Sequence, residues 1–438
     1  YASARIDIRG SGDSEGLIPD EYLAQELDDG AAIIAWLAAQ PWCTGRIGLL
    51  GVSYLAISQY RVAATRPPHL AAICPWEGFT DMYRDFACPG GVREDGFLAM
   101  WSSMTLKGGR VTQDPLAEQR ARPLIDDWWR SRNPALERID VPMLVCGSFS
   151  DHLLHTRGSF EAFRRVGSER KWLWTHRGGK WSTFYSDEAK AVQLRFFDRF
   201  LRDADNGWDA EPPVRIAIHD GGPDPVEIRH ATDWPPPEVE WRDLHLQVTG
   251  VLADVAPTSD GGVGWANADD STRFTWTAPA DVDLIGPPVV NLEVTLEGTA
   301  DATILAALRL FRDGAEVPFE GSYGFDRDVV THGWLRVSHR RLDEERSLPW
   351  LPIHTHDREE PLTQGEIACL AIPLLPQSTR VRAGDELVLE LRSTWLFPHN
   401  PLTGQMPARY VPAAEGTTRL VLGPGHRNVL RLPIAPNP

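Results

Sequence analysis

The 438-residue sequence has no apolar run near the ~20 residues that a membrane-spanning helix needs, which argues against a membrane protein. It is also poor in positive charge, since 44 Lys and Arg stand against 61 Asp and Glu, for a net charge of −17. Phosphate binding requires clustered basic side chains, so a nucleic-acid partner is not expected. The length exceeds one ordinary core, and two or more domains are expected.

The sequence also has few cysteines. There are five, an odd number, and none is in a CxxC motif. Several lie in apolar runs, as at residues 144–146, so we expect buried free thiols rather than a disulfide framework. The five cysteines are Cys43, Cys74, Cys88, Cys146 and Cys369.

The N-terminus lacks an initiator Met, a basic region and an apolar signal segment. The chain opens at Tyr1, and residues 4–10 resemble a strand already under way. We therefore expect an N-terminally incomplete α/β core. A cytoplasmic location is the simplest interpretation, with a signal peptide further upstream left open.

Residues 1–85 alternate short apolar strands with helices, a pattern typical of the first part of a doubly wound α/β core. Residues 86–138 are rich in Gly, Arg and Trp and mostly helical in character, which indicates a cap inserted over the sheet. The α/β pattern resumes over 139–205. The expected strands are 4–10, 47–52, 70–74, 141–146 and 171–175, and the expected helices are 23–39, 54–66, 96–104, 115–132, 158–165 and 186–201.

From residue 206 the composition changes to short strands separated by Gly, Pro and Asp turns. Residues 206–438 are therefore expected to form an all-β sandwich or jelly roll. The clearest strands are 214–218, 244–248, 289–296, 304–311, 334–339, 367–372, 386–392 and 417–422.

The sharpest chemical signal is a serine between a buried strand and a helix. Residues 47–52 read as a strand, Ser53 follows at once, and a helix begins at Tyr54, as in a nucleophile elbow. Gly51 is small, as a tight turn requires, although Leu55 stands where GxSxG has its second Gly. A plain N-cap role for Ser53 is the alternative.

A serine needs a base and an acid, which in this fold follow it along the chain. Asp151 comes just after strand 141–146, and His176 comes directly after strand 171–175. Both positions lie at C-terminal strand ends, where open α/β sheets have their active sites. His152 and His155 compete by proximity to Asp151, but neither follows a strand directly. The sequence thus predicts a triad of Ser53, Asp151 and His176.

Across nearly its whole length the chain resembles the family of cocaine esterase, α-amino-acid ester hydrolases and X-prolyl dipeptidyl-peptidases. These proteins combine an α/β-hydrolase core, a helical cap and a C-terminal jelly roll. The matching stretches are Asp7-Ile8-Arg9-Gly10 with Ser14-Glu15-Gly16, residues 36–43 leading into 51–54, Pro89-Gly90-Gly91, residues 333–340 and residues 361–366.

The resemblance implies a serine hydrolase that cleaves a small ester or amide without a cofactor or metal. It gives Ser53, Asp151 and His176 the roles of nucleophile, acid and base, and it makes the backbone N–H of Tyr54 an oxyanion donor. The family's second donor is a tyrosine upstream of the stretch that matches residues 7–10, and such a donor is worth about 10²- to 10³-fold in rate. The family's G-P-W-x-H reads Trp-Leu-Trp-Thr-His at 172–176.

Several alternatives stay open. A dipeptidyl-peptidase has to capture a free α-amino group, for which Glu77, Asp81 or Asp85 could serve, and a catalytically inert binding protein is possible on fold grounds. His354 and His356 could form a metal pair, but no third ligand is evident, so packing is favoured. Homo-oligomerisation is open. Four tryptophans are candidates for lining an acyl pocket, with packing an equal alternative: Trp76, Trp101, Trp128 and Trp129.

Overall fold

The computed structural model describes residues 1–107, 113–268, 270–322, 327–397 and 408–436. Helices and strands alternate in the first half, as the sequence pattern predicts. The elements in chain order are α1 Ala24–Ala38, β1 Ile47–Val52, α2 Tyr54–Ala63, β2 Leu70–Trp76, α3 Phe97–Lys107, α4 Pro115–Ala121, α5 Asp127–Arg130, β3 Met143–Ser148, α6 Thr156–Arg165, β4 Lys171–His176, α7 Lys180–Phe184 and α8 Asp187–Arg202.

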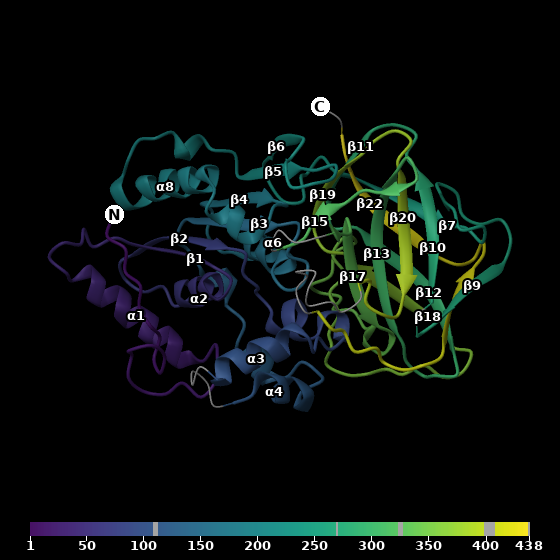
Figure 1. Cartoon of the computed structure of the whole chain (residues 1–438), viewed down its shortest axis with the longest axis horizontal. Helices are drawn as coiled ribbons and strands as arrows, with labels where there is room; N and C mark the ends of the chain where they lie inside the picture. The colour runs from purple at the N-terminus through teal and green to yellow at the C-terminus, as the bar shows by residue number, and fades with distance from the viewer. Residues whose placement is uncertain (108–112, 269, 323–326, 398–407, 437–438) are drawn as a thin grey trace.

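One six-stranded sheet organises this half, in the order β1-β2-β3-β4-β5-β6, where β5 is Val214–Ile218 and β6 is Glu227–Ala231. Strands β1 to β5 are parallel, and β6 runs antiparallel to β5. In Figure 1, α1 and α2 lie on one side of this sheet and α8 lies on the other. The α/β class is therefore confirmed. The composition change at residue 206 precedes the change of sheet, because β5 and β6 still belong to the first one.

Burial on both faces explains why β2 and β3 read as continuous apolar runs. Every residue of β3 is buried. On one face the strands pack with Phe160 and Phe163 of α6, and on the other with Phe196 and Phe200 of α8. Parallel strands covered by helices on both sides have this pattern.

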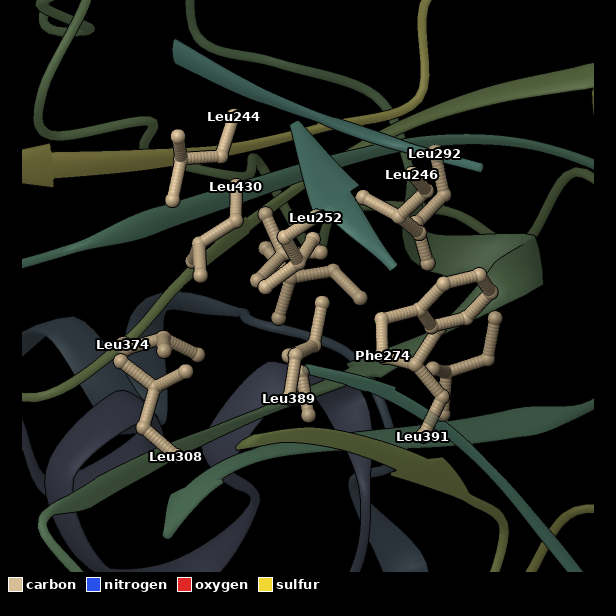
Figure 2. Close-up of a cluster of buried hydrophobic side chains, with 14 of the residues drawn as sticks. Leu244, Leu246, Leu252, Phe274, Leu292, Leu308, Leu374, Leu389, Leu391 and Leu430 are labelled. Atoms are coloured by element: carbon tan, nitrogen blue, oxygen red, sulfur yellow. The ribbon is translucent and has the colours of Figure 1, made fainter. Parts of the chain in front are cut away.

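The second half is antiparallel. A nine-stranded sheet and a five-stranded sheet share one hydrophobic core, and Figure 2 shows leucines and Phe274 from both sheets meeting inside it. The strands are β7 Glu240–Leu246, β8 Leu252–Ala253, β9 Gly261–Ala266, β10 Ser271–Thr277, β11 Val282–Gly286, β12 Val289–Glu297, β13 Thr303–Arg312, β14 Ala315–Glu316, β15 Phe319–Glu320, β16 Arg327–Asp328, β17 Thr331–Arg336, β18 Ala368–Pro373, β19 Gln377–Val381, β20 Glu386–Arg392, β21 Thr417–Leu422 and β22 Val429–Ala435.

The first residues of the chain depart from expectation. Residues 4–10 do not form a strand, because no strand lies beside them to complete a ladder. A cavity of about 1050 Å³ is bordered by these residues and by β1. Within the described residues β1 pairs with β2 alone, so its other edge faces this cavity. No helix in the described part of the chain is both long and apolar enough to cross a membrane.

Candidate active site

Ser53 sits on a sharp turn between β1 and α2. Its backbone has φ 61° and ψ −119°, a conformation that is rare for a residue with a side chain. The Ser53 N–H donates to the carbonyls of Trp76 and Glu77, both at 3.1 Å, which ties the turn to the end of β2. Backbone strain held this way is common at functional sites. The strand–serine–helix arrangement expected from the sequence is therefore present.

The packing around this turn explains the departure from GxSxG. A Cβ on Gly51 would lie 2.4 Å from the Leu55 Cβ, so residue 51 has to be glycine. Leu55 itself is 59 % exposed, and a side chain at that position meets no obstacle. The phenol of Tyr54 donates to Glu26 Oε2 at 2.8 Å, which fixes the first turn of α2 against α1.

The residue beside the serine hydroxyl is His155. Ser53 Oγ lies 3.2 Å from His155 Nε2, and the other ring nitrogen, Nδ1, makes a short hydrogen bond with Asp151 Oδ2. Asp151 and His155 are four residues apart in the turn between β3 and α6. The backbone N–H groups of His155 and Thr156 donate to the Asp151 carbonyl at 3.2 and 3.1 Å. This local turn brings the carboxylate and the ring together, and both side chains are buried.

His176 occupies a different position from the one expected. It is the last residue of β4, where it aligns with Ser148 of β3, and its Nε2 lies 3.1 Å from Glu77 Oε1. No hydrogen bond joins His176 to Ser53 among the residues described. The sequence analysis paired these two residues, whereas in this structure the turn after β3 brings the imidazole of His155 to the serine hydroxyl. The D-x-x-x-H spacing at the start of a helix was the signal for His155.

A buried lysine completes the cluster. Lys180 Nζ lies 2.6 Å from Asp151 Oδ2, 3.7 Å from Glu77 Oε2 and 3.0 Å from His155 Nδ1. Glu77, Asp151 and His155 have donor atoms close enough together for a metal site. The Lys180 ammonium already supplies the positive charge at this point, so we interpret the cluster as an internal ion pair. The sequence pattern did not single out Lys180, and it offered Glu77 only as a candidate for capturing a substrate amine.

The charges in the cluster affect both titrating groups of the Asp151–His155 pair. Burial opposes ionisation of Asp151, but the Lys180 ammonium and the His155 ring outweigh it and hold the pKa of the carboxyl well below its usual range. Burial, followed by the repulsion of Lys180, lowers the pKa of His155 against the opposing pull of Asp151 and Glu77. Asp151 is therefore ionised and His155 neutral at neutral pH, as a carboxylate–base pair requires.

Two of the four tryptophans cannot contact a substrate in this structure. Trp76 and Trp129 are 0 % and 1 % exposed, so water does not reach them, and their burial favours the packing alternative over a pocket-lining role. Trp76 packs on Trp174 at a centroid distance of 5.2 Å, and Trp129 packs on Tyr83 at 5.4 Å. Burial of large rings in the cores explains both.

The other two tryptophans are partly exposed in the cap. Trp101 Nε1 donates to Glu21 Oε2 at 2.8 Å, and the Arg132 guanidinium lies 3.5 Å from the ring centre of Trp128. Both rings pack against the hydrophobic cluster that also contacts Tyr54. A pocket-lining role for these two rings stays a prediction.

His354 and His356 are buried beside a third histidine, His339, whose Nδ1 lies 3.0 Å from His356 Nδ1. Burial and the nearby Arg84 lower the pKa of His354 to about 3, so its ring is neutral. The Arg84 guanidinium donates to the His354 carbonyl at 2.7 Å. These contacts fit the packing role favoured from the sequence.

The β domain holds the loop that follows β4. The Lys180 N–H donates to the Ser322 carbonyl at 2.6 Å, and the Gly179 N–H donates to Glu320 Oε1 at 3.1 Å. The buried Arg177 guanidinium donates to the carbonyls of Val329 and Val330 at 2.5 and 3.1 Å. The position of Lys180 therefore depends on backbone contacts with the second half of the chain.

Comparisons with known proteins agree with this architecture. Residues 1–122 match the X-Pro dipeptidyl-peptidase (S15 family), and residues 206–431 match the X-Pro dipeptidyl-peptidase C-terminal non-catalytic domain. The crystal structure of a CocE/NonD family hydrolase from Staphylococcus aureus has a TM-score of 0.92 and 34 % identity, covering 98 % of this chain and 79 % of that one. Cocaine esterase from Rhodococcus sp. (strain MB1 Bresler) is 27 % identical over 391 residues, which are 75 % of this chain and 63 % of that enzyme.

An α-amino-acid ester hydrolase shares the fold, with a TM-score of 0.70 at 17 % identity over 98 % of this chain and 84 % of that one. The sheet, the elbow and these likenesses define a serine hydrolase with an α/β-hydrolase core and a C-terminal β domain. The chain belongs to the family of serine hydrolases that includes cocaine esterase, the X-Pro dipeptidyl-peptidases and the CocE/NonD hydrolases.

Proposed function

We propose that this hydrolase cleaves carboxylic esters or amides through an acyl-enzyme, with Ser53 as nucleophile, His155 as base and Asp151 as the orienting acid. The observation that carries the proposal is the chain of contacts from Ser53 Oγ to His155 Nε2 and from His155 Nδ1 to Asp151 Oδ2. A nucleophile, a base within reach and a third group that orients the base are the parts that acyl transfer needs.

The tautomer of His155 follows from its partners. The ionised Asp151 accepts a hydrogen bond, so the ring proton resides on Nδ1 and leaves Nε2 with a lone pair toward Ser53. Nε2 takes the hydroxyl proton as Oγ bonds to the substrate carbonyl carbon. The Tyr54 N–H, at the start of α2, stabilises the oxyanion. His155 then protonates the leaving group, and water attacks the acyl-enzyme by the same route in reverse.

The decisive experiment compares wild type with Ser53→Ala on p-nitrophenyl acetate and other short-chain acyl esters. We expect loss of turnover and of labelling by a fluorophosphonate probe. Ser58→Ala is the matched control, because this serine lies on α2 and its hydroxyl donates to the Leu55 carbonyl. Equal rates for wild type and Ser53→Ala would contradict the proposal, as would a probe that labels another serine. Equal rates would instead favour an inert binding protein.

A dipeptidyl-peptidase activity finds little support in the carboxylates singled out for amine capture. Asp81 pairs with Arg84 at 2.6 Å, Asp85 pairs with Arg157 at 2.5 Å, and Glu77 faces the Lys180 ammonium. Each is therefore already engaged by a cation of the chain. We expect simple esters to be hydrolysed faster than dipeptidyl-proline amides, and the opposite preference would assign the peptidase activity.

A further inference from the structure

The mechanism just described gives no role to Lys180, although this lysine lies at its centre. Its side chain is 1 % exposed, and Asp151 and Glu77 beside it are fully buried. Burying an ammonium group is costly unless it is paired and hydrogen-bonded. A lysine buried at this cost is expected to have a role in the site.

We propose that Lys180 is a positioning residue for the reaction, whose ammonium holds the Asp151 carboxylate and disfavours the protonated form of His155. The proposal rests on the proposed function and deepens it. Lys180 thereby keeps His155 neutral and correctly oriented at acidic pH.

The hydrogen bonds of Asp151 are the first argument. Oδ2 is shared between His155 Nδ1–H and the Lys180 ammonium, while Oδ1 accepts no hydrogen bond from the described residues. A fully buried carboxylate with one imidazole as its sole partner would remain poorly stabilised. The ammonium supplies the missing charge, and it fixes the oxygen to which the ring is anchored.

The second argument is the set of charges around His155. Three charged groups surround the ring: Asp151 after β3, Glu77 after β2 and Lys180 at the start of α7. Ser53 lies at the elbow, and His176 at the end of β4 contacts the other carboxylate oxygen of Glu77, Oε1. The two carboxylates favour the imidazolium and Lys180 opposes it at 3.0 Å from Nδ1. Among the described residues Lys180 is thus the cation in direct contact with the ring, and burial together with this contact accounts for the lowered pKa of His155.

The third argument is that the backbone of Lys180 is held by residues other than Ser53, His155 and Asp151. Its N–H is anchored to Ser322 of the β domain, and the preceding Gly179 N–H is anchored to Glu320. The backbone of residues 179–180 is therefore fixed independently of Asp151. An ammonium whose backbone is fixed in this way can position the Asp151 carboxylate, which is the relation that the proposal requires.

The test is the pH dependence of serine reactivity, which a purely structural ion pair would leave unchanged. The second-order rate of fluorophosphonate labelling of Ser53 is measured against pH for wild type, Lys180→Met and Lys180→Gln, together with kcat/KM for p-nitrophenyl acetate. We expect the acidic limb to move to higher pH by about one unit or more in both variants, since a like charge within contact distance shifts a pKa by that order. Lys190→Met is the matched control, because Lys190 forms an exposed pair with Asp187.

Acidic limbs that superimpose on the wild-type curve, or that move to lower pH, overturn the proposal. Should both Lys180 variants fail to fold, the ring of His155 is titrated by NMR in Ser53→Ala with Lys180 intact. We expect titration below the ordinary histidine value of about 6.5, as the combined action of burial and Lys180 requires, and titration at or above that value overturns the role of Lys180. Full activity of Ser53→Ala refutes the proposed function itself, so the two failures are distinguishable.

Discussion

The choice of base between His155 and His176 leads to the most discriminating prediction. His155→Gln removes the imidazole 3.2 Å from Ser53 Oγ, while His176→Gln removes one that contacts Glu77 instead. General-base catalysis contributes about 10²- to 10⁴-fold, so we expect His155→Gln to raise the barrier by roughly 3 to 5 kcal/mol in kcat/KM. The loss should fall mainly on kcat, because the base acts in the transition state.

His176→Gln is the matched control, since both substitutions remove one buried ring from the same cluster. It leaves Glu77 with the Lys180 ammonium at 3.7 Å, and a cost of about 1 to 3 kcal/mol in stability is expected for a disrupted buried hydrogen bond. Its kcat/KM should stay within about tenfold of wild type, or roughly 1.4 kcal/mol. The assay is ester turnover with thermal unfolding measured in parallel. If folded His176→Gln loses as much activity as His155→Gln, or if His155→Gln stays active, the assignment of the base is refuted.

Three further predictions concern the stability of the protein and the exposure of its thiols. Gly51→Ala should lower thermal stability by about 1 to 3 kcal/mol through overpacking against Leu55, whereas Gly425→Ala, where a Cβ meets nothing within 4 Å, should leave the melting temperature unchanged. Arg177→Met should destabilise the protein by at least about 1.5 to 3 kcal/mol because two backbone carbonyls of the β domain lose a charged donor; wild-type stability in urea unfolding would contradict this. A thiol reagent should modify the native protein at the exposed cysteine and leave the three buried ones until denaturation, which mass spectrometry can read: Cys369 against Cys74, Cys88 and Cys146.

Much of the first half could be predicted because each local signal agreed with the fold. The apolar run 47–52 and the helix beginning at Tyr54 appear with those bounds, since a continuous apolar strand and a helix after a tight turn leave clear patterns. Strand 386–392 is likewise as predicted. Residues 4–10 are different, because a strand needs a neighbour and a single segment cannot reveal whether one is present.

Asp151 and Ser53 are readable as site candidates for the same reason, as both come after strands of the sheet. The partner of the serine was harder to predict because the rule applied to it was positional: a base at a strand end. In this chain the strand-end imidazole is engaged by Glu77, whose contact with His176 joins residues 99 positions apart. The contact depends on how the ends of β2 and β4 lie on either side of β3, and no local pattern encodes it.

The proposed acid and base lie in one turn, so fewer distances within the site depend on contacts between elements that are far apart in the chain. With Asp151 and His155 four residues apart, a single turn brings their side chains together, whereas the distance to Ser53 depends on tertiary packing. The segment after β4 then brings a different side chain to the site, because it leads to α7, whose first residue is Lys180. A lysine in that position adds a charge that the Asp–His pair cannot supply for itself. The contacts of residues 179–180 with the β domain therefore connect that domain to the protonation of His155, the proposed base, although no described residue of the domain makes a hydrogen bond to the Ser53 hydroxyl.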